Sequence, residues 1–269
     1  MTSTSILHQT QWMHTAPGLS FSYQDDIAII KMENGLENRI NNQFLEQFSS
    51  ILDEIEGEPS CKALITTGAS KFYSNGLDVD WMSTQSAHTV VDFFRNFQDF
   101  LLRMLLFPLP TLAMINGHAF AGGALLAFTH DIRTMNSQKG WICLNEVKMD
   151  KVANPFMAQY VRTKLGDGQA FTDSLVLGRR FTAAEALRYH IIHLSSPLSS
   201  LAEESITFLE SLCGEDGYRR STLARFKADV FADAVNIYDR DRTQDKVMVA
   251  EQFFTEAQKA EMDQKGPKS

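Results

Sequence analysis

Three short segments of the chain combine glycines, amides and one carboxylate in patterns that suit chemistry on a bound ligand. They are 71–78 (KFYSNGLD), 116–124 (NGHAFAGGA) and 143–147 (CLNEV). The first two carry Asn-Gly or Gly-Gly pairs, and the third carries a single glutamate between apolar residues. Together they indicate a site that uses backbone N–H groups and one acid/base side chain.

The glycine pair in 116–124 predicts an anion-binding backbone. Gly122 and Gly123 open an apolar stretch expected to be a helix over 122–128. Glycine lets a ligand approach the backbone closely. The first N–H groups of a helix have no partner within it and carry the positive end of its dipole. Close packing of the helix explains the two glycines equally well.

The segment 71–78 also suggests a backbone N–H donor. Asn75-Gly76 follows a strand and a loop, so the N–H of Leu77 could point into a cleft. Asn-Gly is also a common turn without any ligand. Asp78 is expected to cap the helix that follows.

Glu146 is the candidate acid/base. Its neighbours Ile142, Leu144, Val147 and Met149 are apolar. Such surroundings disfavour the charged form of a carboxyl group and should raise its pKa. A raised pKa suits a general base near neutral pH. The alternative is a surface glutamate flanked by core residues.

Strands alternating with helices predict an α/β layered core. The expected strands are 20–23, 27–31, 63–67, 111–115 and one near 141–144. The expected helices are 43–55, 88–107, 122–128, 155–165 and 182–189, followed by 201–212, 221–238 and 246–262. This pattern divides the chain into a polar N-terminal arm (1–18), a core (19–199) and a C-terminal helical region (200–269).

The composition limits the class of protein. The 269 residues carry a formal net charge of -8, which argues against a nucleic-acid partner. Cys61, Cys143 and Cys213 are widely spaced, which fits a reducing compartment without structural disulfides. No apolar run reaches the roughly 18–20 residues of a membrane span. No Lys or Arg precedes Lys31, so no targeting signal is evident and a cytoplasmic location is the default expectation.

The order and spacing of the three segments resemble the crotonase (enoyl-CoA hydratase/isomerase) family over about 20–194. KFYSNGLDVDWM and NGHAFAGGALLAFTHDIR resemble its two oxyanion segments, and CLNEV with the following NPF and LGRRFTAAEAL resembles its base segment. Within the family the chain is most similar to monofunctional Δ3,Δ2-enoyl-CoA isomerases. The resemblance implies a spiral of repeated ββα units in two roughly perpendicular sheets. It also implies C-terminal helices that assemble a homotrimer or hexamer, and it brings in a peroxisomal or mitochondrial location as an alternative.

The resemblance also implies roles for individual residues. Leu77 and Gly122 would supply the two oxyanion N–H groups, Glu146 would be the acid/base, and Asn75 would lie near the CoA adenine. The other positions expected at the substrate site are Gly76, Gly123, Leu125, Asp150 and Phe156. The substrate would be an acyl-CoA thioester. No metal and no redox cofactor is implied, because CoA arrives as part of the substrate.

Two departures from the family pattern bear on the reaction. Hydratases of this family use two glutamates, and the first would fall at Leu125, so simple hydration is disfavoured and isomerisation by one base is expected. Asp150 stands where the isomerases usually have a small residue. If 146–150 is helical, Glu146 and Asp150 share one face and Asp150 is a second acid/base; a surface aspartate is the favoured interpretation.

Three functions therefore compete. The first is the isomerase. The second is another crotonase-type reaction, such as hydration, decarboxylation or a pathway-specific lyase or isomerase step using Asp150. The third is a catalytically silent binding subunit.

A few other polar residues could also have a role. Lys227 or Arg225 would meet a CoA phosphate or lie on an exposed helix face. A structural role is favoured for His118 and for His130-Asp131.

Overall fold

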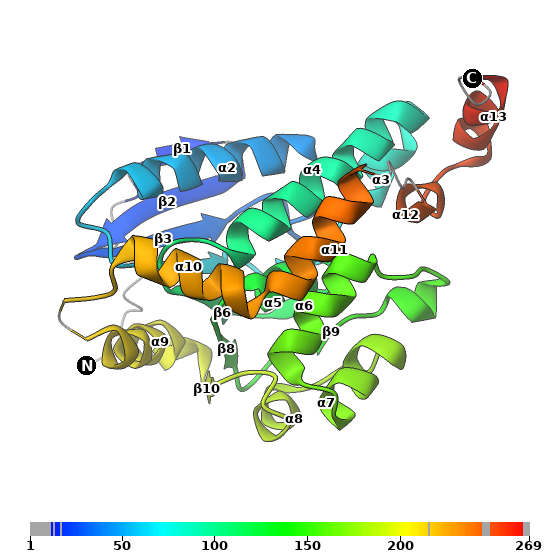
Figure 1. Cartoon of the computed structure of the whole chain (residues 1–269). Coiled ribbons are helices and arrows are strands. Elements are labelled where there is room, and N and C mark those ends of the chain that lie inside the picture. Colours follow the sequence, from blue (N-terminus) through cyan, green and yellow to red (C-terminus); the bar gives the residue numbers. More distant parts are fainter. Residues whose placement is uncertain (1–11, 13, 17, 215, 244–247, 266–269) are drawn as a thin grey trace.

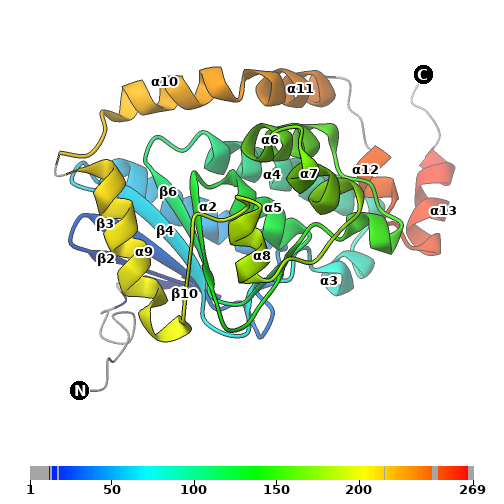
Figure 2. The same ribbon diagram turned by 90° about the horizontal axis from the view of Figure 1, so that it is seen from below.

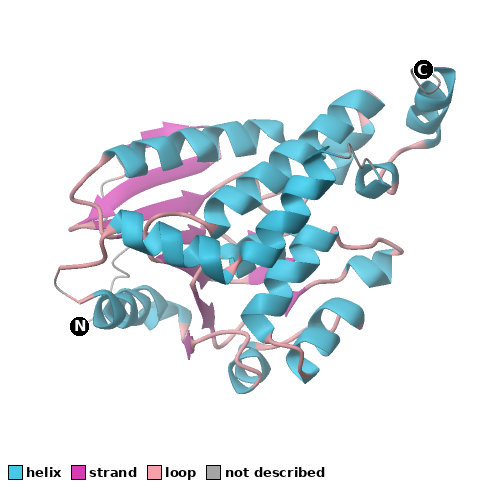
Figure 3. Ribbon diagram, in the orientation of Figure 1, coloured by secondary structure: helices cyan, strands magenta, loops and turns pink. Residues whose placement is uncertain are grey.

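The computed structural model describes residues 12, 14–16, 18–214, 216–243 and 248–265, in which the strands form two sheets (Figure 3). The larger sheet has seven strands, in the order β1 (His14–Ala16), β2 (Leu19–Gln24), β3 (Ile27–Met32), β4 (Ala63–Gly68), β6 (Thr111–Ile115), β8 (Ile132–Asn136) and β10 (Leu194–Ser196). The smaller sheet has three, in the order β5 (Phe72–Ser74), β7 (His118–Phe120) and β9 (Ile142–Cys143). The predicted arm 1–18 lies mostly outside the described residues, but His14–Ala16 belongs to the sheet as β1.

The large sheet begins as an antiparallel meander and continues in parallel. The β2–β3 hairpin turns at Asp25, which has a left-handed φ of 52°. From β3 onward every pairing is parallel, as expected when helices connect the strands.

Helices cover both faces of the large sheet (Figure 1). The core helices are α2 (Asn42–Gly57), α3 (Val79–Ser83), α4 (Ala87–Leu105), α5 (Gly122–Thr129), the 3₁₀ helix η1 (Glu146–Met149), α6 (Pro155–Leu165), α7 (Gln169–Phe171), the π-helix η2 (Thr172–Val176) and α8 (Ala183–Arg188). The C-terminal helices are α9 (Leu198–Cys213), α10 (Arg220–Val230), α11 (Ala232–Thr243), α12 (Met248–Glu251) and α13 (Glu256–Lys265).

The alternation of side chains along each strand produces two apolar layers. On β3, Ile27 and Ile29 point to the face covered by α9, whereas Ala28 and Ile30 point to the opposite face and the main core. Figure 2 shows α9 beside the sheet, with α10 and α11 running along one side of the molecule and α13 at the end far from α9.

The middle of the chain repeats one unit, a strand of the large sheet followed by a strand of the small sheet and then helical structure. β4 is followed by β5, β6 by β7, and β8 by β9. The spiral of ββα units implied by the resemblance is thus present. Because β5, β7 and β9 are parallel neighbours, their carboxyl ends meet at one edge of the small sheet.

Local signals position several helix starts as predicted. Asp78 accepts a hydrogen bond from the N–H of Trp81 and caps α3. Thr182 and Glu185 form a capping box at the start of α8. These interactions are short-range, which is why the sequence predicts them well.

Other elements differ from the predictions. Strands β5, β7, β8 and β10 were not predicted, since they are short or carry polar residues such as Arg133, which is 2% exposed. The predicted helix 221–238 is divided at Phe231 into α10 and α11, and 246–262 contains two separate helices. In the part of the chain that is described, no helix is both long and apolar enough to cross a membrane.

Candidate active site

The three segments singled out in the sequence converge at the edge where the strands of the small sheet end. Asn75, Gly76 and Leu77 follow β5, Gly122 follows β7 within two residues, and Glu146 follows β9. Asn75 and Glu146, which are 71 positions apart in the chain, therefore lie around one cavity, because parallel strands place their carboxyl ends together.

Buried hydrogen bonds hold the loop after β5. The Asn38 side chain, which is 0% exposed, donates to the carbonyl oxygens of Phe72 and Tyr73 at 3.0 and 3.1 Å. Ser74 Oγ donates to the Asn38 carbonyl at 2.7 Å, and the Ile40 N–H donates to the Gly76 carbonyl at 2.8 Å. These bonds turn the Gly76 carbonyl away from the site.

Gly76 and Gly122 approach each other closely. Gly76 has φ of 86°, and a Cβ built on it would lie 3.0 Å from the Gly122 nitrogen. The N–H of Gly122 is the first of α5, and neither it nor the N–H of Leu77 donates a hydrogen bond to another described residue. Two unpaired backbone donors therefore lie side by side.

Ala121 adopts a strained backbone between these donors. Its φ of 46° and ψ of -122° are uncommon for a residue with a side chain. The hydrogen bond from its N–H to the Cys143 carbonyl, at 3.0 Å, holds it in place. Strain of this kind persists where the surrounding structure over-determines it, and such residues cluster at functional sites.

The two donors face a cavity with a volume of about 250 Å³. Leu77, Gly122, Leu125, Asn75 and Glu146 all line it, as predicted for substrate-site residues. Much of the wall is apolar and comes from α4, α6 and the segment after α12, with Phe94, Phe97, Met157 and Phe253 among its residues. A mostly apolar cavity with a few converging polar groups is typical of a ligand site.

Burial changes the acid/base properties of Glu146. It raises the pKa of this carboxyl group to about 7, and Oε2 has no hydrogen-bond partner among the described residues. The predicted direction is confirmed, but the neighbours differ from those expected. Val147 and Met149 are 46% and 43% exposed, and the burial comes from tertiary packing around the cavity.

The raised pKa predicts a pH-dependent stability cost. Because the folded pKa lies above the ordinary value of 4.5, the folded state loses stability as pH rises through about 7. Glu146→Gln is expected to differ from wild type by less than about 1 kcal/mol near pH 5 and to be more stable by about 3 kcal/mol near pH 8. Urea unfolding at both pH values measures this. The exposed Glu46→Gln on α2 is the control, and an equal difference at both pH values would contradict the prediction.

Asp150 does not share a face with Glu146. Residues Glu146–Met149 form a 3₁₀ helix rather than an α-helix, and Asp150 ends it in a left-handed conformation with φ of 54°. The side chain is exposed and does not line the cavity. The shared-face arrangement that would make Asp150 a second acid/base is therefore wrong for this structure, and the surface interpretation fits.

Three other predicted substrate-site residues also lie outside the cavity lining. Phe156 is 0% exposed and packs on the rings of Tyr160 and Tyr238. Gly76 and Gly123 act through the backbone: a Cβ on Gly123 would lie 2.3 Å from the Ser74 carbonyl oxygen. These glycines allow β5 and α5 to approach each other.

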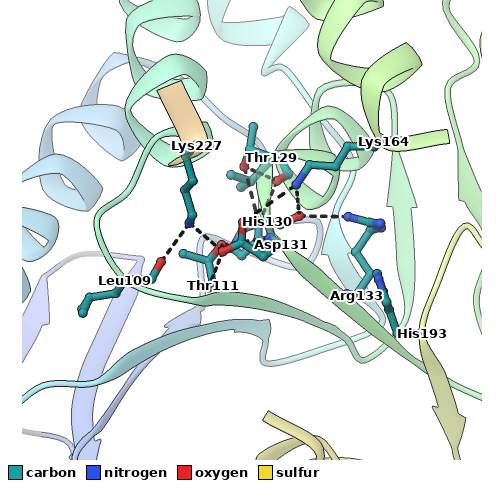
Figure 4. Close-up of polar contacts among 10 residues, drawn as sticks. Leu109, Thr111, Thr129, His130, Asp131, Arg133, Lys164, His193 and Lys227 are labelled. Atoms are coloured by element: carbon teal, nitrogen blue, oxygen red, sulfur yellow. Dashed lines mark hydrogen bonds and ion pairs between the residues drawn. The ribbon is translucent and has the colours of Figure 1, made fainter. Parts of the chain in front are cut away.

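Lys227 and His130 have structural partners (Figure 4). Lys227 is 5% exposed and donates to Asp131 Oδ2 at 2.6 Å and to the Leu109 carbonyl at 2.9 Å. It is thus neither on an exposed face nor free to meet a CoA phosphate. Arg225 does lie on an exposed face, paired with Asp229. His130 is 0% exposed and Nε2 lies 2.9 Å from Thr66 Oγ1, which confirms a structural role.

The sequence did not point to several of the residues that line the cavity, and Arg39 and Phe253 are two of them. Arg39 is the one cationic residue in its described lining, and it pairs with Glu37 and Asp80. Phe253 reaches the cavity from the C-terminal region and packs on Phe94 with ring centroids 5.1 Å apart. Arg39 lies in a polar loop without a recognisable motif. No local pattern connects Phe253 to Glu146, which lies 107 positions earlier in the chain.

The fold and the cavity define an α/β protein whose candidate ligand site combines backbone N–H groups and one buried carboxyl group. The family model described as enoyl-CoA hydratase/isomerase matches residues 22–268. The chain therefore belongs to the enoyl-CoA hydratase/isomerase (crotonase) family.

Some of the individual relatives are named as isomerases and others as hydratases. The chain is 29% identical over 187 residues to the peroxisomal enoyl-CoA delta isomerase 1 of Arabidopsis thaliana, covering 68% of this chain and 76% of that protein. It is 34% identical over 170 residues to the mitochondrial enoyl-CoA delta isomerase 1 of Rattus norvegicus, covering 62% and 58%. A putative enoyl-CoA hydratase of Thermus thermophilus is 29% identical, covering 60% and 64%.

Solved structures agree on the fold. The crystal structure of human mitochondrial delta3-delta2-enoyl-CoA isomerase matches with a TM-score of 0.80 and 21% identity, covering 92% of this chain and 96% of that one. An enoyl-CoA hydratase from Mycobacterium ulcerans matches with a TM-score of 0.75 and 19% identity, covering 88% and 99%. At these identities the likeness concerns the fold alone.

Proposed function

We propose that this protein is a Δ3,Δ2-enoyl-CoA isomerase, which moves the double bond of a 3-enoyl-CoA to the 2-position. One observation carries the proposal: a single buried carboxyl group, that of Glu146, faces the same cavity as two unpaired backbone N–H groups. The position of a second catalytic glutamate is occupied by Leu125, which is 4% exposed and also lines the cavity.

The backbone donors stabilise negative charge on the thioester oxygen. The carbonyl oxygen of the substrate accepts hydrogen bonds from the N–H groups of Leu77 and Gly122. The dipole of α5 favours negative charge at the Gly122 end. These donors are in place before reaction, so charge that develops on the oxygen is stabilised without reorganisation.

Glu146 performs both proton transfers. Its carboxylate removes a proton from C2, and the electrons pass through the thioester to give a dienolate. The protonated carboxyl group then returns the proton to C4, and the double bond ends between C2 and C3. A pKa of about 7 lets Glu146 act as base and then as acid near neutral pH. Leu125 can neither orient water nor transfer a proton.

The family and its named relatives support a proposal for the substrate, pathway, assembly and location. The apolar wall at Phe94, Phe97 and Met157 would hold the acyl chain. We propose that the reaction serves fatty-acid β-oxidation, and that the C-terminal helices assemble a homotrimer or hexamer. Relatives named as peroxisomal and mitochondrial support one of these locations over the cytoplasmic default.

Hydration of 2-enoyl-CoA is the second candidate, because proteins named as hydratases also match the chain. Hydration needs a positioned water as well as a base. Leu125 and the apolar wall beside Glu146 argue against it.

Product analysis separates the two reactions. With trans-3-hexenoyl-CoA the expected product is the conjugated 2-enoyl thioester, detected by its ultraviolet absorbance. With trans-2-hexenoyl-CoA we expect 3-hydroxyacyl-CoA to form at least about 100-fold more slowly, since general acid–base assistance of that size is missing. Fast hydration with slow isomerisation would reverse the assignment. Failure to bind any acyl-CoA would instead support a silent binding subunit.

A further inference from the structure

Buried cations gather at the end of α5 opposite to the site. Lys164 on α6 and Arg133 on β8 both donate to the carbonyl oxygen of His130, which ends α5, at 3.0 and 2.9 Å (Figure 4). Lys227 on α10 lies beside them and donates to Asp131 at 2.6 Å. Asp131 is the one carboxylate paired with these cations in the described part of the chain.

The balance of charge in this cluster is unusual for a protein interior. Arg133 is 2% exposed and Lys227 is 5% exposed, and only 11% of the Lys164 side chain is exposed. Three cations thus gather near a single carboxylate, which pairs with two of them, Lys164 and Lys227. Arg133 has carbonyl acceptors, from His130 and Ile191, but no ion-pair partner among the described residues. Buried charges are costly unless they are paired, so a purely structural cluster would be expected to contain more carboxylates.

α5 connects this cluster to the proposed oxyanion site. The helix has eight residues, all buried, so its two ends lie about 12 Å apart at 1.5 Å per residue. Its first residue, Gly122, carries one of the two unpaired N–H groups. Cations at the carboxyl end of a helix also stabilise its dipole.

We infer that Lys164 is a positioning residue whose positive charge, acting through α5 and the intervening interior, stabilises the negative charge that forms on the thioester oxygen. The inference rests on the proposed function, because it requires the dienolate. The neutral thioester of the bound substrate is stabilised little by the charge of Lys164. Loss of this charge should therefore lower kcat and leave KM nearly unchanged. Lys164 Nζ lies 3.0 Å beyond the His130 carbonyl oxygen, and the thioester oxygen would lie about one hydrogen bond beyond Gly122, so the charge and the oxygen are about 18 Å apart. At an effective dielectric constant of about 20, a unit charge at that distance changes the rate about fivefold.

Lys164 can lose its charge near neutral pH, whereas His130, His193 and Arg133 keep their charge states. Burial, together with Arg133 and Lys227 and against the effect of Asp131, lowers the pKa of Lys164 to about 7. Burial lowers the pKa of His130 to about 3 and that of His193 to about 4, so both stay neutral. The pKa of Arg133, lowered to about 10, leaves it charged. Lys164 is therefore charged below about pH 7 and neutral above it.

Two substitutions separate charge from hydrogen bonding. Lys164→Gln keeps an N–H donor for the His130 carbonyl but removes the charge, whereas Lys164→Arg keeps both. The readout is exchange of the C2 protons of trans-3-hexenoyl-CoA in D₂O, followed by NMR, together with isomerisation. Thermal unfolding checks that each variant is folded. The protonation of Glu146 changes with pH in wild type and in both variants. Ratios of their rates at one pH therefore largely remove the contribution of Glu146.

At about pH 6 we expect wild type and Lys164→Arg to be about fivefold faster than Lys164→Gln, with similar KM. At about pH 8.5 wild type should approach the Gln variant, while Lys164→Arg stays fast. The ratio of the Lys164→Arg rate to the wild-type rate tests the inference even if Lys164→Gln fails to fold. Equal rates for wild type and Lys164→Gln at pH 6, or ratios independent of pH, would overturn the inference. Exchange without isomerisation would reject the isomerase assignment alone, and loss of both in wild type would reject both proposals.

Discussion

Glu146→Gln is expected to lower kcat for isomerisation of trans-3-hexenoyl-CoA by about 10²–10⁴-fold, toward the upper end of that range. The described cavity lining holds two carboxyl groups, and one of them, Asp80, is exposed and paired with Arg39. Glu146 has the buried carboxyl group, and it performs both proton transfers in the proposed reaction. Glutamine has nearly the same size and cannot accept the C2 proton. The formation of conjugated product, followed by ultraviolet absorbance, measures the effect.

The same variant is well suited to separate chemistry from folding. Because the glutamate is costly to bury in its charged form, Glu146→Gln should be at least as stable as wild type at neutral pH. Its KM should change little, since the amide fills the same space. Glu46→Gln on the exposed face of α2 should retain full activity. Substantial residual isomerisation by a folded Glu146→Gln protein would mean that another group is the base.

Gly123→Ala is expected to reduce kcat/KM by about 10²–10³-fold, comparable to the loss of one oxyanion donor. The added Cβ would lie 2.3 Å from the Ser74 carbonyl oxygen and 2.7 Å from its carbon, both of which are backbone atoms. α5 and β5 must therefore move apart. The N–H groups of Gly122 and Leu77 move with these two elements and no longer converge on one oxygen.

Stability should fall as well, by about 1–3 kcal/mol, as is typical of an overpacked interior. The matched control is Gly57→Ala at the end of α2, where an added Cβ meets nothing within 4 Å. That variant should keep both activity and stability. Normal kcat/KM in a folded Gly123→Ala protein would show that the spacing of these two segments does not control the reaction.

The sequence alone determined much of the architecture. The α/β alternation, the hairpin β2–β3, the helices α2, α4, α5 and α6 and the caps at Asp78 and Thr182 all follow from local periodicity and capping chemistry. The three motifs also identified the family and the cavity-lining residues Leu77, Gly122, Leu125 and Glu146. These features depend on residues near one another in the chain.

The tertiary structure decided what depends on distant neighbours. It alone shows that the parallel strands β5, β7 and β9 bring three separated segments to one edge, and that burial raises the pKa of Glu146 to about 7. Asp150 lies outside the site in the structure, because 146–149 forms a 3₁₀ helix and not an α-helix. The sequence suggested Lys227 as a candidate ligand for a CoA phosphate, whereas the structure shows it as a buried partner of Asp131. Burial, pKa and pairing are set by atoms contributed from elsewhere in the fold, and no local pattern in the chain records them.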